Sequence, residues 1–277
     1  MDKKYFLETQ LTDKQIALFY LGQVGFIIKY KNKFILVDGY LSDYVDKNCC
    51  SENVKWIRNY PAPIEAEELD FIDFVFCTHA HFDHADPYTL SKIVDVNKKA
   101  KFIVPSAIRD TVKRYEICDD NLIGIKSNEE MMLDDDITVR AIPAAHEELH
   151  PDGNGSHFEV GYRFELGDIS VFHGGDGCPY DGLEEQITGC NILILPVNGR
   201  DYYRTNVCDI IGCFDSREAA IIAKNCCADL LIPTHFDLYD VNCISPAEFV
   251  DKLYTVNKTQ KFHVFVPGER YIYDGNI

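Results

Sequence analysis

Three histidines and an aspartate lie close together in residues 78–87, which read THAHFDHADP. His79, His81, Asp83 and His84 form the pattern H-x-H-x-D-H. In an extended segment, His79 and His81 point to the same side because side chains alternate along the chain. Asp83 and His84 can then reach a second point nearby, which suits two metal ions that share one water. The alternative interpretation is a solvated polar loop, but clustered ligand types are costly without a metal or a partner.

The neighbouring elements must hold these side chains in place. Residues 71–77 form an apolar run that predicts a buried strand, and Asp86 followed by Pro87 predicts the start of a helix. The candidate ligands therefore lie on a loop between a strand end and a helix start. Rigid elements commonly hold binding groups on such loops.

The H-x-H-x-D-H loop resembles the motif of the metallo-β-lactamase superfamily, and four further segments match that family's set in the same order. They are residues 37–39 (VDG), 145–147 (AHE), 174–177 (GGDG) and 233–235 (PTH). The resemblance implies one metal on His79, His81 and His146, a second on Asp83, His84 and His235, and Asp176 as a bridge between them. It also implies that Asp38 orients a metal-binding histidine by accepting a hydrogen bond from it. Plain turns at Asp38 and Asp176 are the alternatives.

The same resemblance implies an α/β fold, namely a four-layer αβ/βα sandwich of two mixed sheets with helices outside. Residues 1–277 are expected to form a single domain. The sequence pattern predicts strands at 17–21, 26–30, 34–37, 101–105, 137–142, 158–166, 168–173, 191–196 and 230–233, and helices at 88–99, 106–115 and 216–226. The alternation of strands and helices predicts that part of the sheet is parallel. Residues 40–70 are expected to be irregular and partly helical.

Composition narrows the range of partners. The chain has 45 acidic and 27 basic residues and a net charge of -18, which disfavours nucleic acid held through phosphate contacts. No apolar run is long enough to span a membrane, and the chain start lacks the apolar core of an export signal. The 11 cysteines include no C-x2-C pair and are expected to be free thiols in a reducing cytoplasm. A homo-oligomer is compatible with the sequence.

The implied ligands all offer nitrogen or oxygen, which suits two divalent ions of Zn²⁺ or Mn²⁺, and also of Fe²⁺. Two close dications lower the pKa of a shared water, so that a metal-bound hydroxide can attack an ester, lactone, amide or phosphoester. Asp83 is expected to bind metal and also to accept a proton.

Within the superfamily, the chain resembles the branch that contains L-ascorbate-6-phosphate lactonase, through residues 20–30, 79–86, 172–177, 198–204, 216–220 and 232–237. This implies a metal-dependent hydrolase acting on a small lactone or ester that carries a phosphate. A phosphodiesterase of the same fold and a non-catalytic metal-binding protein are the alternatives. A redox di-iron protein would need a flavin partner domain, for which the chain has no room.

Three residues after the strand predicted at 191–196 are candidates for substrate binding. Asn198, Arg200 and Arg204 are expected to hold an anionic group, because the planar guanidinium suits phosphate or carboxylate. The alternative is that the region of Arg200 and Asp201 only pins its own loop by ion pairing.

Several other residues carry weaker signals. Some β-lactamases of the superfamily use a cysteine ligand near the position of Asp176, but Cys178 is two residues further on and is not expected to bind metal. His150 and His157 lie in a loop rich in Gly, Asn and Asp, where exposure to solvent and a role in the site are equally compatible with the sequence. Trp56 lines the site or packs in the core, and His263 is expected to be a structural strand histidine.

Overall fold

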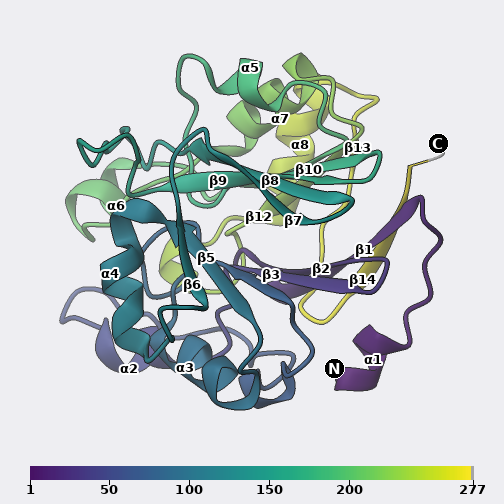
Figure 1. Cartoon of the computed structure of the whole chain (residues 1–277). Helices are drawn as coiled ribbons and strands as arrows, with labels where there is room; N and C mark the ends of the chain where they lie inside the picture. Colours follow the sequence, from purple (N-terminus) through teal and green to yellow (C-terminus); the bar gives the residue numbers. More distant parts are fainter. Residues whose placement is uncertain (276–277) are drawn as a thin grey trace.

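Two seven-stranded sheets packed face to face form the centre of the computed structural model, which describes residues 1–275 (Figure 1). The first sheet has the order β14(Arg270–Asp274), β1(Gln15–Gly22), β2(Gly25–Tyr30), β3(Lys33–Val37), β4(Phe74–Phe76), β5(Lys101–Pro105) and β6(Leu122–Ile125). The second has the order β13(Lys261–Phe262), β12(Leu230–Thr234), β11(Ile192–Pro196), β10(Ile169–His173), β9(Val160–Leu166), β8(Ile137–Pro143) and β7(Glu130–Asp134).

Each sheet is antiparallel in one half and parallel in the other. In the first sheet, β14, β1, β2 and β3 pair antiparallel and β3 to β6 pair parallel. In the second, β7 to β10 pair antiparallel and β10 to β13 pair parallel. The expected pair of mixed sheets is thus confirmed, with parallel strands whose carboxyl ends can share one edge.

Helices cover the outer faces of both sheets (Figure 1). The chain forms α1(Lys3–Leu7), α2(Tyr44–Asn48), α3(Pro87–Val96), α4(Arg109–Val112), α5(Leu183–Ile187), α6(Tyr202–Asn206), α7(Ser216–Asn225) and α8(Pro246–Val256), with 3₁₀ turns at Ala66–Glu68, Ser106–Ile108, Lys113–Tyr115 and Asp240–Asn242. Helices α5, α7 and α8 lie over the second sheet, whereas α3 lies over the first. The layers follow the order expected for an αβ/βα sandwich. Within residues 1–275, no helix combines the length and apolar character that a membrane span requires.

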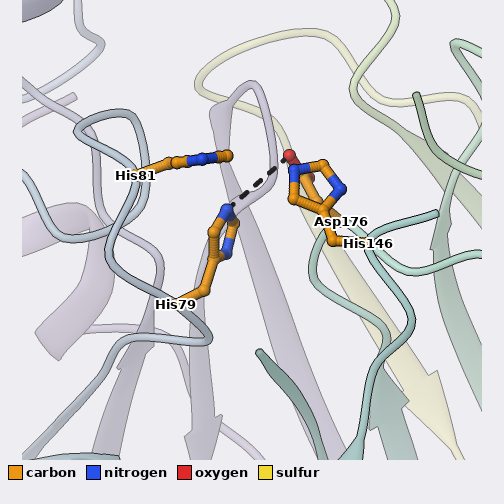
Figure 2. Close-up of side chains that lie close together, drawn as sticks. All are labelled: His79, His81, His146 and Asp176. Atoms are coloured by element: carbon orange, nitrogen blue, oxygen red, sulfur yellow. Dashed lines mark ion pairs between the residues drawn. The ribbon is translucent and has the colours of Figure 1, made fainter. Parts of the chain in front are cut away.

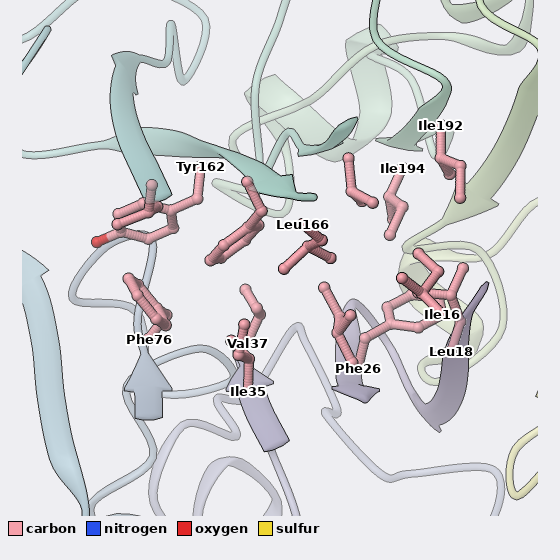
Figure 3. Packing of buried hydrophobic residues seen from close by; sticks show 14 of the residues in the cluster. Ile16, Leu18, Phe26, Ile35, Val37, Phe76, Tyr162, Leu166, Ile192 and Ile194 are labelled. Atoms are coloured by element: carbon pink, nitrogen blue, oxygen red, sulfur yellow. The ribbon is translucent and has the colours of Figure 1, made fainter. Parts of the chain in front are cut away.

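The strands are apolar on both faces because both faces are covered. Along β1, Ile16, Leu18 and Tyr20 enter the core between the sheets, whereas Ala17 and Phe19 pack outward, toward the helices. Figure 3 shows the inner core, in which side chains from the two sheets interdigitate. This explains why the sequence of β1 is a continuous apolar run and not an alternating one.

Two sequence predictions differ from the structure in this part of the chain. The strand before the histidine loop covers only Phe74–Phe76 and not all of residues 71–77. The helix predicted at 106–115 is broken into two 3₁₀ turns around the four-residue α4, and no side chain caps the start of the first turn. By contrast, α3 begins as predicted, because the Asp86 side chain accepts a hydrogen bond from the Tyr88 amide and Pro87 occupies the first turn.

Candidate metal centre

Four strand ends bring the predicted ligands to one edge of the sandwich. The loop after β4 carries His79, His81, Asp83 and His84, while His146 follows β8, Asp176 follows β10 and His235 follows β12. The first sheet therefore supplies four of these side chains and the second sheet supplies three.

The first predicted ligand set is assembled as the sequence indicated. One ligand atom each from His79, His81, His146 and Asp176 lie within 4.8 Å of one another. Figure 2 shows the three imidazoles and the carboxylate around a common space. The ring centroids of His79 and His81 are 4.5 Å apart, and those of His81 and His146 are 5.0 Å apart. Three nitrogens and an oxygen at this separation suit one divalent ion.

The second predicted set lies directly beside the first. Asp83, His84 and His235 also bring their ligand atoms within 4.8 Å of one another. Asp176 connects the two sets, since its Oδ2 lies 3.2 Å from Nε2 of both His84 and His235 and 4.0 Å from His79 Nε2. The position of Asp176 is therefore the one expected of a bridging carboxylate.

Unpartnered polar atoms test whether a metal fits this site. His79 Nε2, His84 Nε2 and Asp176 Oδ1 are buried and have no hydrogen-bond partner among the described residues. Buried polar atoms without partners are rare and costly in proteins. Because these three atoms lie where the two ligand sets meet, divalent cations would satisfy them. The residues present therefore fit a metal centre.

Burial keeps two first-set histidines neutral. It lowers the pKa of His79 well below the ordinary value, and the neighbouring imidazoles of His84 and His81 lower it further. Burial likewise lowers the pKa of His146 to about 4. A neutral imidazole has a free lone pair, so these two rings are ready to bind a cation near neutral pH.

In the second set, the histidine pKa values are raised and not lowered. Burial opposes a positive charge on His84, but Asp176, Asp83 and Asp38 outweigh it and raise the pKa of that imidazole. The pKa of His235 is raised in the same way, mainly by Asp176 against the effect of burial. Without a cation these carboxylates draw protons onto the imidazoles, which indicates a local surplus of negative charge.

Asp38 is fully buried and contacts the candidate ligand His84 and its neighbour in the loop, Thr78. Its Oδ2 lies 2.9 Å from His84 Nδ1 and accepts a hydrogen bond from Thr78 Oγ1, while its Oδ1 accepts one from the Thr78 amide at 2.7 Å. Pairing of Nδ1 with the carboxylate places the ring proton there and leaves Nε2 of His84 directed at Asp176. This is the arrangement predicted for Asp38.

Two residues near the centre were missed in the sequence. The Gln23 side-chain amide donates to Asp83 Oδ2 at 2.8 Å and lies 3.1 Å from His235 Nε2. Cys213 forms a close group with Asp176 and His235, and burial raises the pKa of its thiol. Gln23 lies within residues 20–30, which carry the resemblance to the lactonase branch, but nothing in that segment marks its amide as a partner of Asp83. Cys213 is far from the histidine loop and matches no motif, so the fold reveals both contacts.

A cavity of about 230 Å³ opens onto both ligand sets. Apart from the metal-ligand candidates His81, Asp83, His146, Asp176 and His235, it is lined by Val45, Cys49, Trp56, Phe82, Asp209, Ile210, Ile211, Tyr239 and Asn242. Val45, Cys49 and Trp56 show that the segment 40–70 contributes to the cavity wall. Trp56 combines the two roles predicted for it, because it lines the cavity and also packs edge-on against Tyr239, with 5.2 Å between the ring centroids.

The predicted anion-binding residues lie elsewhere. Asn198, Arg200 and Arg204 line a separate hollow beside α7 and α8 and not the cavity at the metal centre. The Arg200 guanidinium donates to Glu218 of α7 and to the Cys213 carbonyl.

The neighbours of Arg200 are also engaged in local contacts. Arg204 pairs with Asp201, and the Asn198 amide donates to Asn242 Oδ1 at 3.1 Å. The structure therefore places these three side chains away from the metal cavity, and the contacts of Arg200 match the loop-pinning alternative.

The remaining histidines and Cys178 have local partners. His150 Nδ1 lies 3.1 Å from Glu159 Oε2, and His157 Nδ1 lies 2.9 Å from Ser127 Oγ. His263 lies just beyond the two-residue β13, with its ring paired to Glu269, so it is structural but outside the strand. Cys178 accepts a hydrogen bond from Arg200 and belongs to neither ligand set.

Comparison with known proteins shows which family the chain resembles in sequence and in fold. The sequence model of the family described as "Beta-lactamase superfamily domain" matches residues 34–236. A metal-dependent hydrolase from Caldivirga maquilingensis is 24% identical over 90% of this chain and 95% of its own length. Another from Aeropyrum pernix is 25% identical over 93% of this chain and 97% of its own. The solved structure of a metallo hydrolase from Ignicoccus hospitalis superimposes with a TM-score of 0.69 at 19% identity, covering 94% of this chain and 99% of that one.

Proposed function

This chain belongs to the β-lactamase superfamily and has the fold of its metal-dependent hydrolases, and from that premise we propose that it hydrolyses a small lactone or ester with two bound divalent ions. The proposed ions are Zn²⁺ or Mn²⁺, with Fe²⁺ compatible with the same nitrogen and oxygen donors.

One observation carries the proposal: Asp176 of the first ligand set also lies 3.2 Å from two nitrogens of the second, and both sets face an open cavity. Structural metal sites are usually closed by protein ligands, whereas catalytic sites keep a position open for water or substrate. A non-catalytic metal-binding protein has no need of the cavity.

The chain's own residues have distinct tasks in this proposal. When bound, the metal pair supplies a hydroxide at neutral pH and a positive field for the developing oxyanion. Asp83 has a side chain 19% exposed, more than Asp176, and it lines the cavity, so it can accept a proton released during the reaction. The Gln23 amide, by donating to Asp83 Oδ2, holds that carboxylate in position.

The size of the cavity supports a small substrate. Its volume of about 230 Å³ is below the range of roughly 300–1,000 Å³ that is typical for drug-sized ligands. A lactone such as that of the ascorbate-6-phosphate-like branch is of suitable size. The phosphate has less support than the lactone, since Arg200 and Arg204 lie in the other hollow and are already paired.

The proposed location is the cytoplasm. All 11 cysteines are unpaired in the structure, including the adjacent Cys49 and Cys50. Free thiols in this number suit a reducing compartment.

The test is a hydrolysis panel on metal-free and metal-loaded protein. Small lactones, phenyl acetate, an amide and bis(4-nitrophenyl) phosphate would be assayed after full chelation and after adding back Zn²⁺ or Mn²⁺. We expect metal-dependent turnover of lactones or esters, loss of that turnover in His79→Gln, and retention in the control His150→Gln, whose ring contacts Glu159 outside the site. Turnover only of the phosphodiester would favour the phosphodiesterase alternative. Tight metal binding without any turnover would favour the non-catalytic one.

A further inference from the structure

The cavity at the metal centre is lined by acidic side chains and by no basic ones of the Lys or Arg type among the described residues. Its wall includes the carboxylates of Asp83, Asp176 and Asp209. The first two belong to the ligand sets, so their charge would be offset by bound cations. Asp209 belongs to neither set. Its carboxylate therefore adds a negative charge to the lining that does not belong to either ligand set.

The two arginines that precede Asp209 in the sequence, Arg200 and Arg204, do not supply a positive charge to the cavity. Arg200 is held by Glu218 and by the Cys213 carbonyl, while Arg204 is paired with Asp201 and donates to Asn242 at 3.0 Å. Moving either guanidinium into the cavity would break a charge-assisted hydrogen bond. An anionic group on the substrate body would thus meet Asp209 with neither of these guanidinium groups beside it.

Asp209 is exposed but its position is fixed by its neighbours. Cys208 and Ile210 on either side are buried in a small cluster with Val54, against which Trp56 packs. The Ile210 amide also donates to the Arg204 carbonyl at 2.9 Å. Among the described residues no hydrogen bond or ion pair engages the Asp209 carboxylate, so it remains available to a ligand.

The other parts of the wall are apolar and aromatic. Trp56, Phe82 and Tyr239 provide rings, and Ile210 and Ile211 provide aliphatic surface. Aromatic rings attract cations as well as apolar groups, with the strongest effect for Trp. A carboxylate beside such rings is a combination that suits an organic ammonium group.

We propose that the substrate has a small apolar body bearing an ammonium group, that Asp209 pairs with this group, and that anionic bodies are rejected. This inference rests on the proposed function, because it assumes that the reacting bond lies at the metal centre. It narrows the substrate from any small ester or lactone to an uncharged or cationic one, with the cationic one preferred.

The first experiment compares three esters of nearly equal size on the metal-loaded protein. They are phenyl acetates with an aminomethyl, a hydroxymethyl or a carboxymethyl group in the para position. We expect kcat/KM to be highest for the ammonium ester and at least about tenfold lower for the carboxylate ester. In Asp209→Asn, the ratio of ammonium to neutral ester should fall by roughly three- to tenfold, as for the loss of one partly exposed ion pair.

Asp168→Asn is the matched control, since Asp168 is an exposed aspartate in the turn between β9 and β10 and the substitution removes the same charge. It should leave the ratio unchanged. Equal shifts in the two variants, or a wild-type preference for the carboxylate ester, would overturn the proposal.

The second experiment separates this inference from the proposed function. The benzyltrimethylammonium ion can neither bind a metal nor be hydrolysed, so its affinity, measured by ligand-observed NMR, does not depend on turnover. Weaker binding to Asp209→Asn than to wild type and Asp168→Asn is expected even if no ester is cleaved. Hydrolysis of the neutral ester combined with equal affinities for all three proteins would instead retain the hydrolase and overturn the ammonium site.

Discussion

Replacing Asp38 by Asn should weaken metal binding at the second site without disturbing the first. The substitution keeps the size of the side chain and removes its charge. Asp38 has a positive φ of 46°, a conformation that Asn adopts readily, so the backbone should tolerate the change. Alanine would add backbone strain and is the poorer choice.

The magnitude follows from the contacts of Asp38. Its two oxygens accept from the Thr78 amide, Thr78 Oγ1 and His84 Nδ1 at 2.7–2.9 Å. An Asn has one acceptor oxygen in place of two, so either Thr78 or His84 loses its partner. A hydrogen bond to a charged group contributes about 1.5–3 kcal/mol, which corresponds to roughly a 10- to 100-fold change in metal affinity if His84 is the group affected. Loss of similar supporting contacts in other metal sites has effects of about this size.

The assay is a calorimetric titration of the metal-free protein with Zn²⁺. The metal content of the protein is then measured after dialysis. Asp73→Asn is the control, because the Asp73 carboxylate also accepts from a backbone amide, that of Phe34, but touches no candidate ligand. Retained affinity at the first site would show that Asp38→Asn has folded. If Asp38→Asn bound two ions as tightly as wild type, the assignment of Asp38 as the residue that orients His84 would be wrong.

Three further predictions concern the same region. Asp83→Asn should retain its metals and lower kcat by at least about a hundredfold, the lower range for a group that transfers a proton, and a fully active variant would contradict that role. Arg200→Lys should lower Tm by about 2–4 °C, as expected for a loss near 1 kcal/mol, and leave KM for an anionic ester unchanged, whereas a tenfold rise in that KM alone would restore the anion-binding interpretation. Burial opposes the charge on His84 and His235, but nearby carboxylates raise the pKa of both in the metal-free protein, so their protons must leave when metal binds. Affinity at the second site should therefore rise with pH, and calorimetry in buffers of different ionisation enthalpy should detect proton release; binding without it would refute the inference.

The structure brings together the candidate ligands whose relative positions are decided by local geometry. His79, His81 and His84 share one short loop, and an extended strand followed by a capped helix fixes how that loop runs. His146 and His235 were implied by the family resemblance, and each lies within three residues of a strand end, that of β8 or of β12. The ends of parallel or sandwiched strands meet at common edges, so a strand boundary already indicates where a side chain will lie.

A strand end did not predict the position of Arg200, and its contacts give the physical reason. It also follows a strand, β11, but it lies after Gly199, which has a φ of 73°, and both residues line the other hollow. Glu218, in the first turn of α7, then pairs with the guanidinium. This pairing joins residues 18 positions apart, and neither periodicity nor a motif predicts it.

The candidate ligands come from both sheets, so a bound metal ion would also stabilise the packing of the two sheets at this edge. The first sheet contributes the loop after β4, and the second contributes His146, Asp176 and His235. An ion that binds ligands from both sheets would therefore link the two sheets at this edge. The unpartnered nitrogens and the local surplus of carboxylates make the same edge costly without cations, because like charges and unpaired polar atoms are then buried together. Metal binding and sheet packing should therefore support each other. Asp209 lines the cavity but belongs to neither ligand set, so its replacement should change substrate preference while the ligand geometry stays fixed.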